Sequence, residues 1–174
     1  MSQGWWVGVP APGTTGDAHL LATLDRALAG TGRRAVQVLT HVDRSAPVAR
    51  TTASWQLSPG AADHRDDGLP ARLADALGGP VATRSEAPSD GRVVRSPGPS
   101  FTGPVPVADL VEAGLVVVGI GAPVGEDDLV DTLDGHLRPE RTPDGDRLLV
   151  EPAGPGRWRP AEISDPHQCC GGVH

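Results

Sequence analysis

The apolar residues of this chain come in short segments, which limits it to short strands and single helices. The longest uninterrupted apolar run extends only from residue 115 to 118. A membrane-spanning helix needs about 20 apolar residues, so this run is far too short to span a bilayer. The full length of 174 residues suits one domain with a substantial apolar core.

Several segments have the pattern of β-strands. Residues 35–42 alternate like a half-buried strand, and residues 50–57 are a second candidate that can pair with them antiparallel. Residues 115–120 carry continuous β-branched side chains without alternation, which predicts a central strand covered on both faces. The remaining strand candidates are residues 4–9, 92–95 and 147–151.

Helical spacing of apolar residues alternates with these strands. The clearest case is residues 17–29, where Leu20, Leu24 and Leu28 are four positions apart and glycines follow. The other predicted helices are residues 69–77, 107–112 and 126–137.

Alternation of strands and helices predicts an α/β fold: a single domain with a mixed, mostly parallel sheet flanked by helices. Residues 1–151 should form this domain, and residues 152–174 an irregular C-terminal tail. Right-handed crossovers would bring the ends of strands 4–9 and 115–120 to one edge of the sheet. Loops at such an edge are where α/β proteins usually bind ligands.

The charge and amino-acid composition of the chain argue against some classes of function. The chain has a net charge of −7, no lysine and no basic stripe, which argues against nucleic-acid binding. Its N-terminus lacks the basic flank and apolar run of a signal peptide, so we expect a cytoplasmic protein. The absence of lysine, asparagine and tyrosine is typical of a GC-rich bacterial genome, as in many actinobacteria.

The last eight residues contain both cysteines of the chain. Cys169 and Cys170 are adjacent, so they cannot cross-link the fold, and His167 and His174 lie on either side. Thiolate and imidazole are ligands of zinc and copper(I). Adjacent cysteines strain a closed zinc site, whereas copper(I) accepts fewer ligands. These four residues therefore predict a metal-binding or metal-handling tail, with zinc or copper(I) as the candidate ions.

Other interpretations of the tail remain open. It can be an inert end without a specific site, or a vicinal thiol pair that oxidises readily. It can also be a processed C-terminus, in which residues 173 and 174 are removed after the Gly171-Gly172 pair.

No nucleotide cofactor is expected. Residues 8–13 have the spacing of a phosphate-binding loop, but Thr14 stands where such a loop needs lysine, and Pro10 and Pro12 remove backbone donors. Residues 119–125 are also glycine-rich, yet the acidic residues 126–128 that follow would repel a pyrophosphate.

Two alternative functions belong to different classes. The first is a small or degenerate enzyme that binds an anionic metabolite at the loops after strands 4–9 and 115–120, with Arg44 or Arg50 as anion ligands. His41 with Asp43, and His64 within an acidic cluster, are the candidate catalytic pairs. The second is a structural subunit, in which some of the four tryptophans, Trp5, Trp6, Trp55 and Trp158, anchor an interface.

Overall fold

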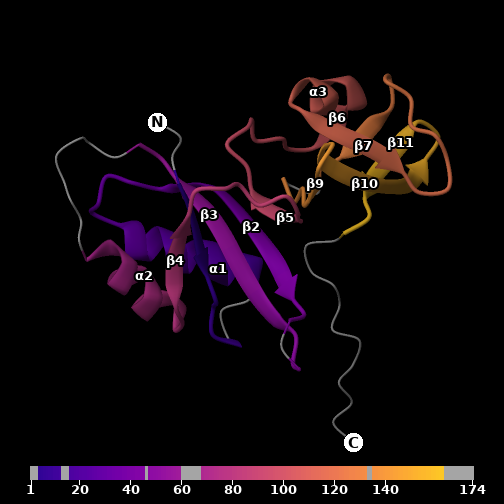
Figure 1. Ribbon diagram of the computed structural model, residues 1–174. Helices are drawn as coiled ribbons and strands as arrows, with labels where there is room; N and C mark the ends of the chain where they lie inside the picture. The colour runs from indigo at the N-terminus through magenta and orange to yellow at the C-terminus, as the bar shows by residue number, and fades with distance from the viewer. Residues whose placement is uncertain (1–3, 13–15, 46, 60–67, 133–134, 163–174) are drawn as a thin grey trace, which may run out of the picture. The chain divides into compact units, whose positions relative to one another are not determined.

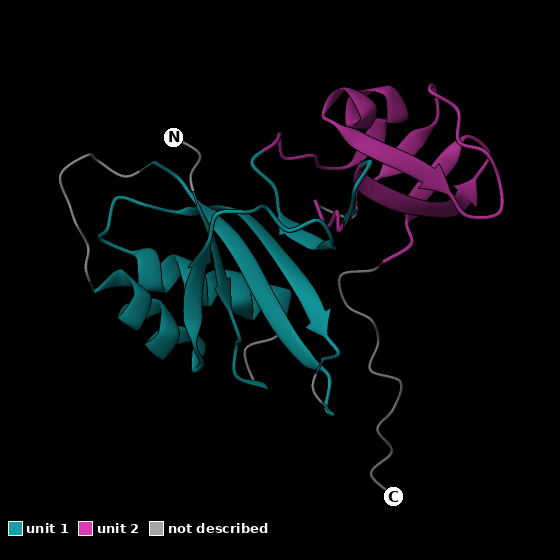
Figure 2. Ribbon diagram, in the orientation of Figure 1, with its two compact units in different colours: residues 1–97, 140–144 teal, residues 98–139, 145–174 magenta. Residues whose placement is uncertain are grey.

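The computed structural model describes residues 4–12, 16–45, 47–59, 68–132 and 135–162. The chain divides into two compact units (Figures 1 and 2). Unit 1 comprises residues 1–97 and 140–144, and unit 2 comprises residues 98–139 and 145–174. Each unit has its own apolar core, so each is described separately.

Unit 1 is built on an antiparallel sheet. Its strands, in the order in which they pair across the sheet, are β4 (Val81–Arg84), β1 (Trp5–Gly8), β3 (Arg50–Leu57), β2 (Ala35–Asp43), β5 (Gly91–Arg95) and β9 (Glu140–Thr142). Every neighbouring pair in this series is antiparallel. The hairpin of β2 and β3 is the longest pairing, and it confirms the antiparallel pair predicted for these segments.

Two helices, α1 (Asp17–Leu28) and α2 (Leu69–Leu77), cover one face of this sheet (Figure 1). In α2, the leucines at positions 69, 73 and 77 are all buried, which follows from their spacing of four on one side of a helix. The helix ends at Gly78, whose φ of 71° suits glycine, and whose N–H donates to the carbonyl of Ala74.

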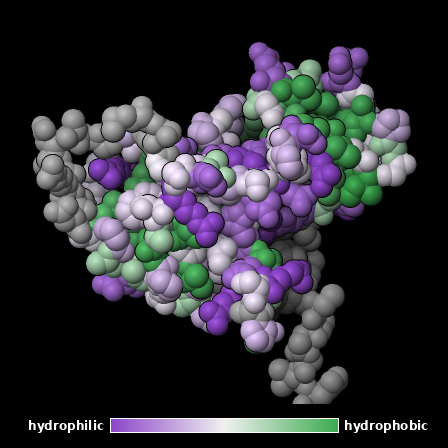
Figure 3. Space-filling model, viewed as in Figure 1, coloured by the Kyte–Doolittle hydropathy of each residue, from purple (hydrophilic) through white to green (hydrophobic). Residues whose placement is uncertain are grey.

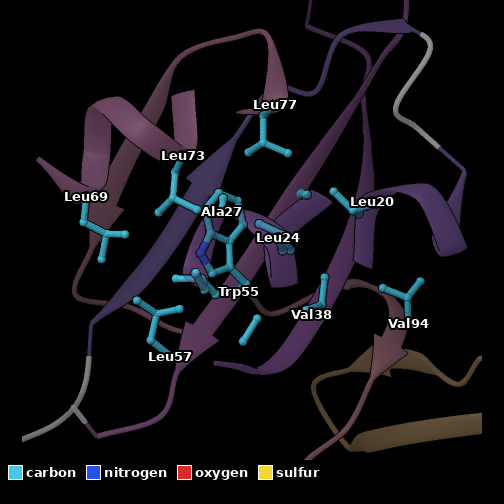
Figure 4. Packing of buried hydrophobic residues seen from close by; sticks show 13 residues of the cluster. Leu20, Leu24, Ala27, Val38, Trp55, Leu57, Leu69, Leu73, Leu77 and Val94 are labelled. Carbon is cyan, nitrogen blue, oxygen red and sulfur yellow. The ribbon is translucent and has the colours of Figure 1, made fainter. Parts of the chain in front are cut away.

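Trp55 of β3 lies at the centre of the unit 1 core. Figure 4 shows its indole surrounded by apolar side chains from both helices and from the strands. The ring is fully buried. Gly8 of β1 leaves room for it, because an added Cβ at that position would lie 3.0 Å from both Cη2 of Trp55 and Cδ1 of Leu77.

Unit 2 combines parallel and antiparallel pairing. Its elements are β6 (Pro104–Pro106), α3 (Val107–Glu112), β7 (Leu115–Gly119), β8 (Leu129–Asp131), β10 (Gly145–Gly154) and β11 (Arg157–Pro160). β10 pairs parallel with β7 and antiparallel with β11. β8 pairs parallel with β11 and antiparallel with β6. The core of the unit includes Leu110, Leu148 and Trp158.

The predicted fold class is wrong, although most of its elements are confirmed. Helices form at residues 17–28, 69–77 and 107–112, close to the predicted bounds, and strands occupy the predicted strand segments. The described strands, however, pair mostly antiparallel, and the three described helices are short. The sheet is therefore not a mostly parallel one flanked by helices.

The helix predicted for residues 126–137 is also wrong. Leu129–Asp131 forms β8 instead, paired on both sides by other strands. Before it, a carboxylate oxygen of Asp128 accepts hydrogen bonds from the backbone N–H of Gly125 and from Nε1 of Trp158, both at 2.8 Å. These contacts stabilise a turn and a strand where local leucine spacing favours a helix.

The predicted central position of residues 115–120 is a third correction. β7 pairs with β10 alone among the described strands, so it lies at an edge. Its side chains alternate between partly buried and exposed, and Val116 and Val118 are on the exposed side. The described part of the predicted irregular tail, residues 152–162, contains β11 and its buried Trp158.

Two valines on β2 provide a matched test of the unit 1 core. Val38 is fully buried, whereas Val42 on the same strand is 59% exposed. Val38→Ala should lower the free energy of unfolding of unit 1 by about 2 kcal/mol, because it removes two buried methyl groups. Val42→Ala should change it by less than about 0.5 kcal/mol. Urea unfolding followed by tryptophan fluorescence measures both, and equal effects would contradict the described core.

Candidate functional site

A polar cavity lies on the face of the unit 1 sheet that the helices leave uncovered. Side chains alternate between faces along a strand. Ala53 and Trp55 of β3 point into the core beneath the helices, so Thr52 and Ser54 point the other way. Residues that pair across neighbouring strands share a face of the sheet. Val7 of β1 therefore lies beside Ser54, and His41 of β2 lies beside Thr52.

The cavity has a volume of about 560 Å³, within the range of small-molecule sites. The strands form its floor, and the segment between β4 and β5 supplies one wall. Its lining is mostly polar and consists of Val7, His41, Val42, Asp43, Ser45, Thr52, Ser54, Arg84, Glu86, Ala87, Pro88, Ser89 and Asp90.

His41 is the most buried titratable group of this lining. Its side chain is 15% exposed, and Nδ1 lies 3.6 Å from a carboxylate oxygen of Asp90. Nε2 is buried without a hydrogen-bond partner among the described residues. Burial lowers the pKa of His41 and nearby Arg84 lowers it further, and the opposing effect of Asp90 does not cancel them. His41 is therefore neutral at pH 7.

Gly91 holds the His41 ring in place from the first position of β5. Its φ is 117°, a backbone conformation that side chains rarely adopt. An added Cβ would lie 2.5 Å from both Cε1 and Nδ1 of His41. The imidazole thus packs directly against the backbone of Gly91, and any larger residue there would displace the ring.

Negative charge predominates around the cavity. The lining contains three carboxylates, those of Asp43, Glu86 and Asp90, and one guanidinium, that of Arg84, while Arg50 outside the lining acts on Asp43. Asp43 accepts a 2.8 Å hydrogen bond from the backbone N–H of Ser45. The Ser45 hydroxyl and this N–H together lower the pKa of Asp43, so its carboxylate stays charged at neutral pH.

The sequence-predicted pair His41 and Asp43 lies within this cavity, because both side chains project from the same face of β2. The carboxylate closest to His41, however, belongs to Asp90, which sequence spacing did not identify. Arg84 was missed as well. The available signal was the concentration of charged residues from 84 to 92.

The other predicted sites are not part of the cavity. Arg44 and Arg50 are absent from its lining. Three of the tryptophans, Trp5, Trp55 and Trp158, are buried core residues, and the fourth packs against the core of unit 1.

The predicted metal ligands fall outside the part of the chain that the structure describes. These are His167, Cys169, Cys170 and His174, and the acidic cluster around His64 is also outside it. Within the described residues, no group of three or more His, Cys, Asp or Glu side chains is placed to hold a metal ion. None of the helices in the described ranges is long and apolar enough to cross a membrane.

Comparisons with family models, with curated proteins and with solved structures gave no match. The chemistry of the cavity therefore has to be argued from its own residues.

The lowered pKa of His41 predicts a pH dependence of stability. The unfolded chain binds a proton at this histidine near its ordinary pKa of 6.5, whereas the folded protein resists protonation until lower pH. The contribution of neutral His41 to stability is thus complete above about pH 6.5 and is lost as the pH falls through the folded pKa. His41→Gln should reduce the loss of stability between pH 7 and pH 5, measured by urea unfolding.

The control for this experiment is His19→Gln, which changes an exposed histidine on α1. It should keep the pH dependence of the original protein. If His41→Gln and the original protein lose stability equally over this pH range, the burial of a neutral imidazole is contradicted.

Proposed function

We propose that unit 1 binds a small polar molecule with a positively charged group in the cavity beside His41. The observation that carries this proposal is the charge of the lining, in which three carboxylates surround a polar space and one guanidinium opposes them. An amine or guanidinium group of a ligand can form charge-assisted hydrogen bonds with such carboxylates.

Neutral His41 favours a cationic ligand. It adds no positive charge to the cavity at neutral pH, because burial lowers its pKa. The neighbouring carboxylate belongs to Asp90, whose side chain is 86% exposed and therefore accessible to solvent and to a ligand. Acidification would protonate His41, add a like charge and weaken binding of a cation.

Arg84 and the hydroxyl groups of the lining allow the ligand to have a carboxylate or hydroxyl groups in addition to its cationic group. Arg84 lines the cavity together with the hydroxyls of Ser45, Thr52, Ser54 and Ser89. A guanidinium binds a carboxylate through two parallel hydrogen bonds. The lining thus suits a zwitterion or a hydroxylated amine better than a simple anion, which three carboxylates would repel.

Binding of three probes of similar size tests this proposal: agmatine, arginine and glutarate. NMR titration of the full chain should show agmatine and arginine shifting resonances of the cavity residues, while glutarate does not. Asp90→Asn should weaken agmatine binding by about two- to fivefold, as expected for loss of one exposed ion pair. Asp75→Asn, on the exposed side of α2, is the matched control and should leave binding unchanged.

Stronger binding of glutarate than of agmatine would reject the cationic ligand. It would favour instead the anionic metabolite considered from the sequence, with Arg84 rather than Arg44 or Arg50 as its partner.

A second candidate function is metal binding by the C-terminal residues. The observation that favours it is the presence of four soft or borderline ligands, His167, Cys169, Cys170 and His174, among the last eight residues. A protein with both properties would handle a metal ion at one site and a small organic ligand at the other.

Truncation after Pro166 tests the metal function directly. The full chain, reduced and dialysed against zinc or against copper(I), should retain about one metal ion per chain, and the truncated chain should retain none. Replacement of Cys169 and Cys170 by serine in the full chain should have the same effect, because thiolates are the strongest ligands of the set. Equal metal content in the full and truncated proteins, measured by elemental analysis, would rule this function out.

A further inference from the structure

The sheet of unit 2 exposes apolar side chains at its β7 edge. Val116 and Val118 are 45% and 37% exposed, and Leu149 of the neighbouring β10 is 37% exposed. The pairing register places Val118 beside Leu149, and Ile120, 48% exposed, continues the apolar surface past the end of the strand. Figure 3 shows hydrophobic residues gathered over this part of unit 2. We call these four residues the β7 patch.

The β7 patch is centred on a strand that has a described strand partner along one edge only. Among the described strands, β7 hydrogen-bonds only with β10, so one row of its backbone N–H and C=O groups has no strand partner. Edge strands usually carry a charge, a proline or a bulge that prevents pairing with another chain. The sequence of β7, LVVVG, has neither a charge nor a proline, and its pairing with β10 is regular.

We infer that two copies of this chain associate by antiparallel pairing of their β7 strands. The strand is complementary to itself in this arrangement. With Val117 on the twofold axis, Val116 of one copy lies opposite Val118 of the other, on the same exposed face of the joined sheet. The two β7 patches then meet as one continuous apolar surface, and the free backbone groups of both strands are paired.

The residues next to β7 are compatible with this register. Ile120 follows the end of β7 and Gly114 precedes its start, so antiparallel pairing brings Ile120 of one copy near Gly114 of the other. An added Cβ at Gly114 would meet no atom within 4 Å, so there is room for the larger side chain. Residues 115–119 carry no charge, so pairing of the two strands brings no like charges together. This match along the whole strand favours a second copy of the chain over an unrelated apolar peptide.

Sedimentation velocity over a wide range of protein concentrations tests the dimer, with a reducing agent present so that Cys169 and Cys170 cannot form intermolecular disulfides. The original protein should show a concentration-dependent dimer. Val118→Lys should raise the dimer dissociation constant by roughly tenfold or more, because it places a charge within the apolar surface. Val48→Lys, at a valine of unit 1 that is 72% exposed, is the matched control and should leave the dimer unchanged.

A mixture of two variants tests the register itself. Val116→Glu alone should also weaken the dimer. When it is mixed with Val118→Lys, the antiparallel register brings the new glutamate of one copy opposite the new lysine of the other, so a heterodimer should form more strongly than either homodimer. Circular dichroism should confirm that both variants remain folded.

The proposal is overturned if the original protein stays monomeric at every concentration. It is equally overturned if Val118→Lys dimerises as strongly as the original protein, which would place the contact on another surface. Failure of the mixed variants to form a heterodimer would reject antiparallel pairing about Val117.

Discussion

Burial of the Trp55 indole is the constraint on which unit 1 depends. The ring is fully buried between the sheet and the two helices, although its Nε1 has no hydrogen-bond partner among the described residues. An unsatisfied donor costs about 1–3 kcal/mol, so the apolar contacts of the ring have to offset that cost. They do so only because Gly8 carries no side chain that would compete for the space beside the ring. The size of the Trp55 side chain on β3 thus requires glycine at position 8 of the neighbouring strand β1.

The same strands that hold this core also form the cavity. On β2, Val38 packs into the core, whereas His41 faces the cavity on the opposite side of the sheet. The register between β2 and β5 shifts by a β-bulge or irregularity between Val38 and Leu39. Both residues are fully buried, Val38 on one face of the sheet and Leu39 on the other. Because a slip of one residue would exchange the two faces, core packing fixes the position of His41 relative to Gly91 and Asp90. Stability and ligand chemistry are therefore linked through one strand.

Local sequence patterns predicted the elements well and their pairing poorly. The leucine spacing of α2 and the following glycine defined that helix, because both signals act within a few residues. Strand direction and edge position depend on partners far along the chain, so β7 looked central although it lies at an edge. The same holds for the site. Alternation along β2 predicted that His41 and Asp43 share one face, because it is a local signal. No local signal indicated that Asp90, far along the chain, approaches His41.

The division of the chain into two units has a consequence for how this protein can be altered or inherited. The chain passes between the units after residues 97, 139 and 144, so neither unit is encoded by one continuous stretch of the gene. A fragment ending at residue 97 would lack β9 and leave β5 as a bare edge of its sheet. A single gene segment that contains all of unit 1 has to extend from residue 1 to residue 144, and it then also carries residues 98–139 of unit 2. Exchange of such a segment would separate residues 98–139 from residues 145–174, which belong to the same compact unit.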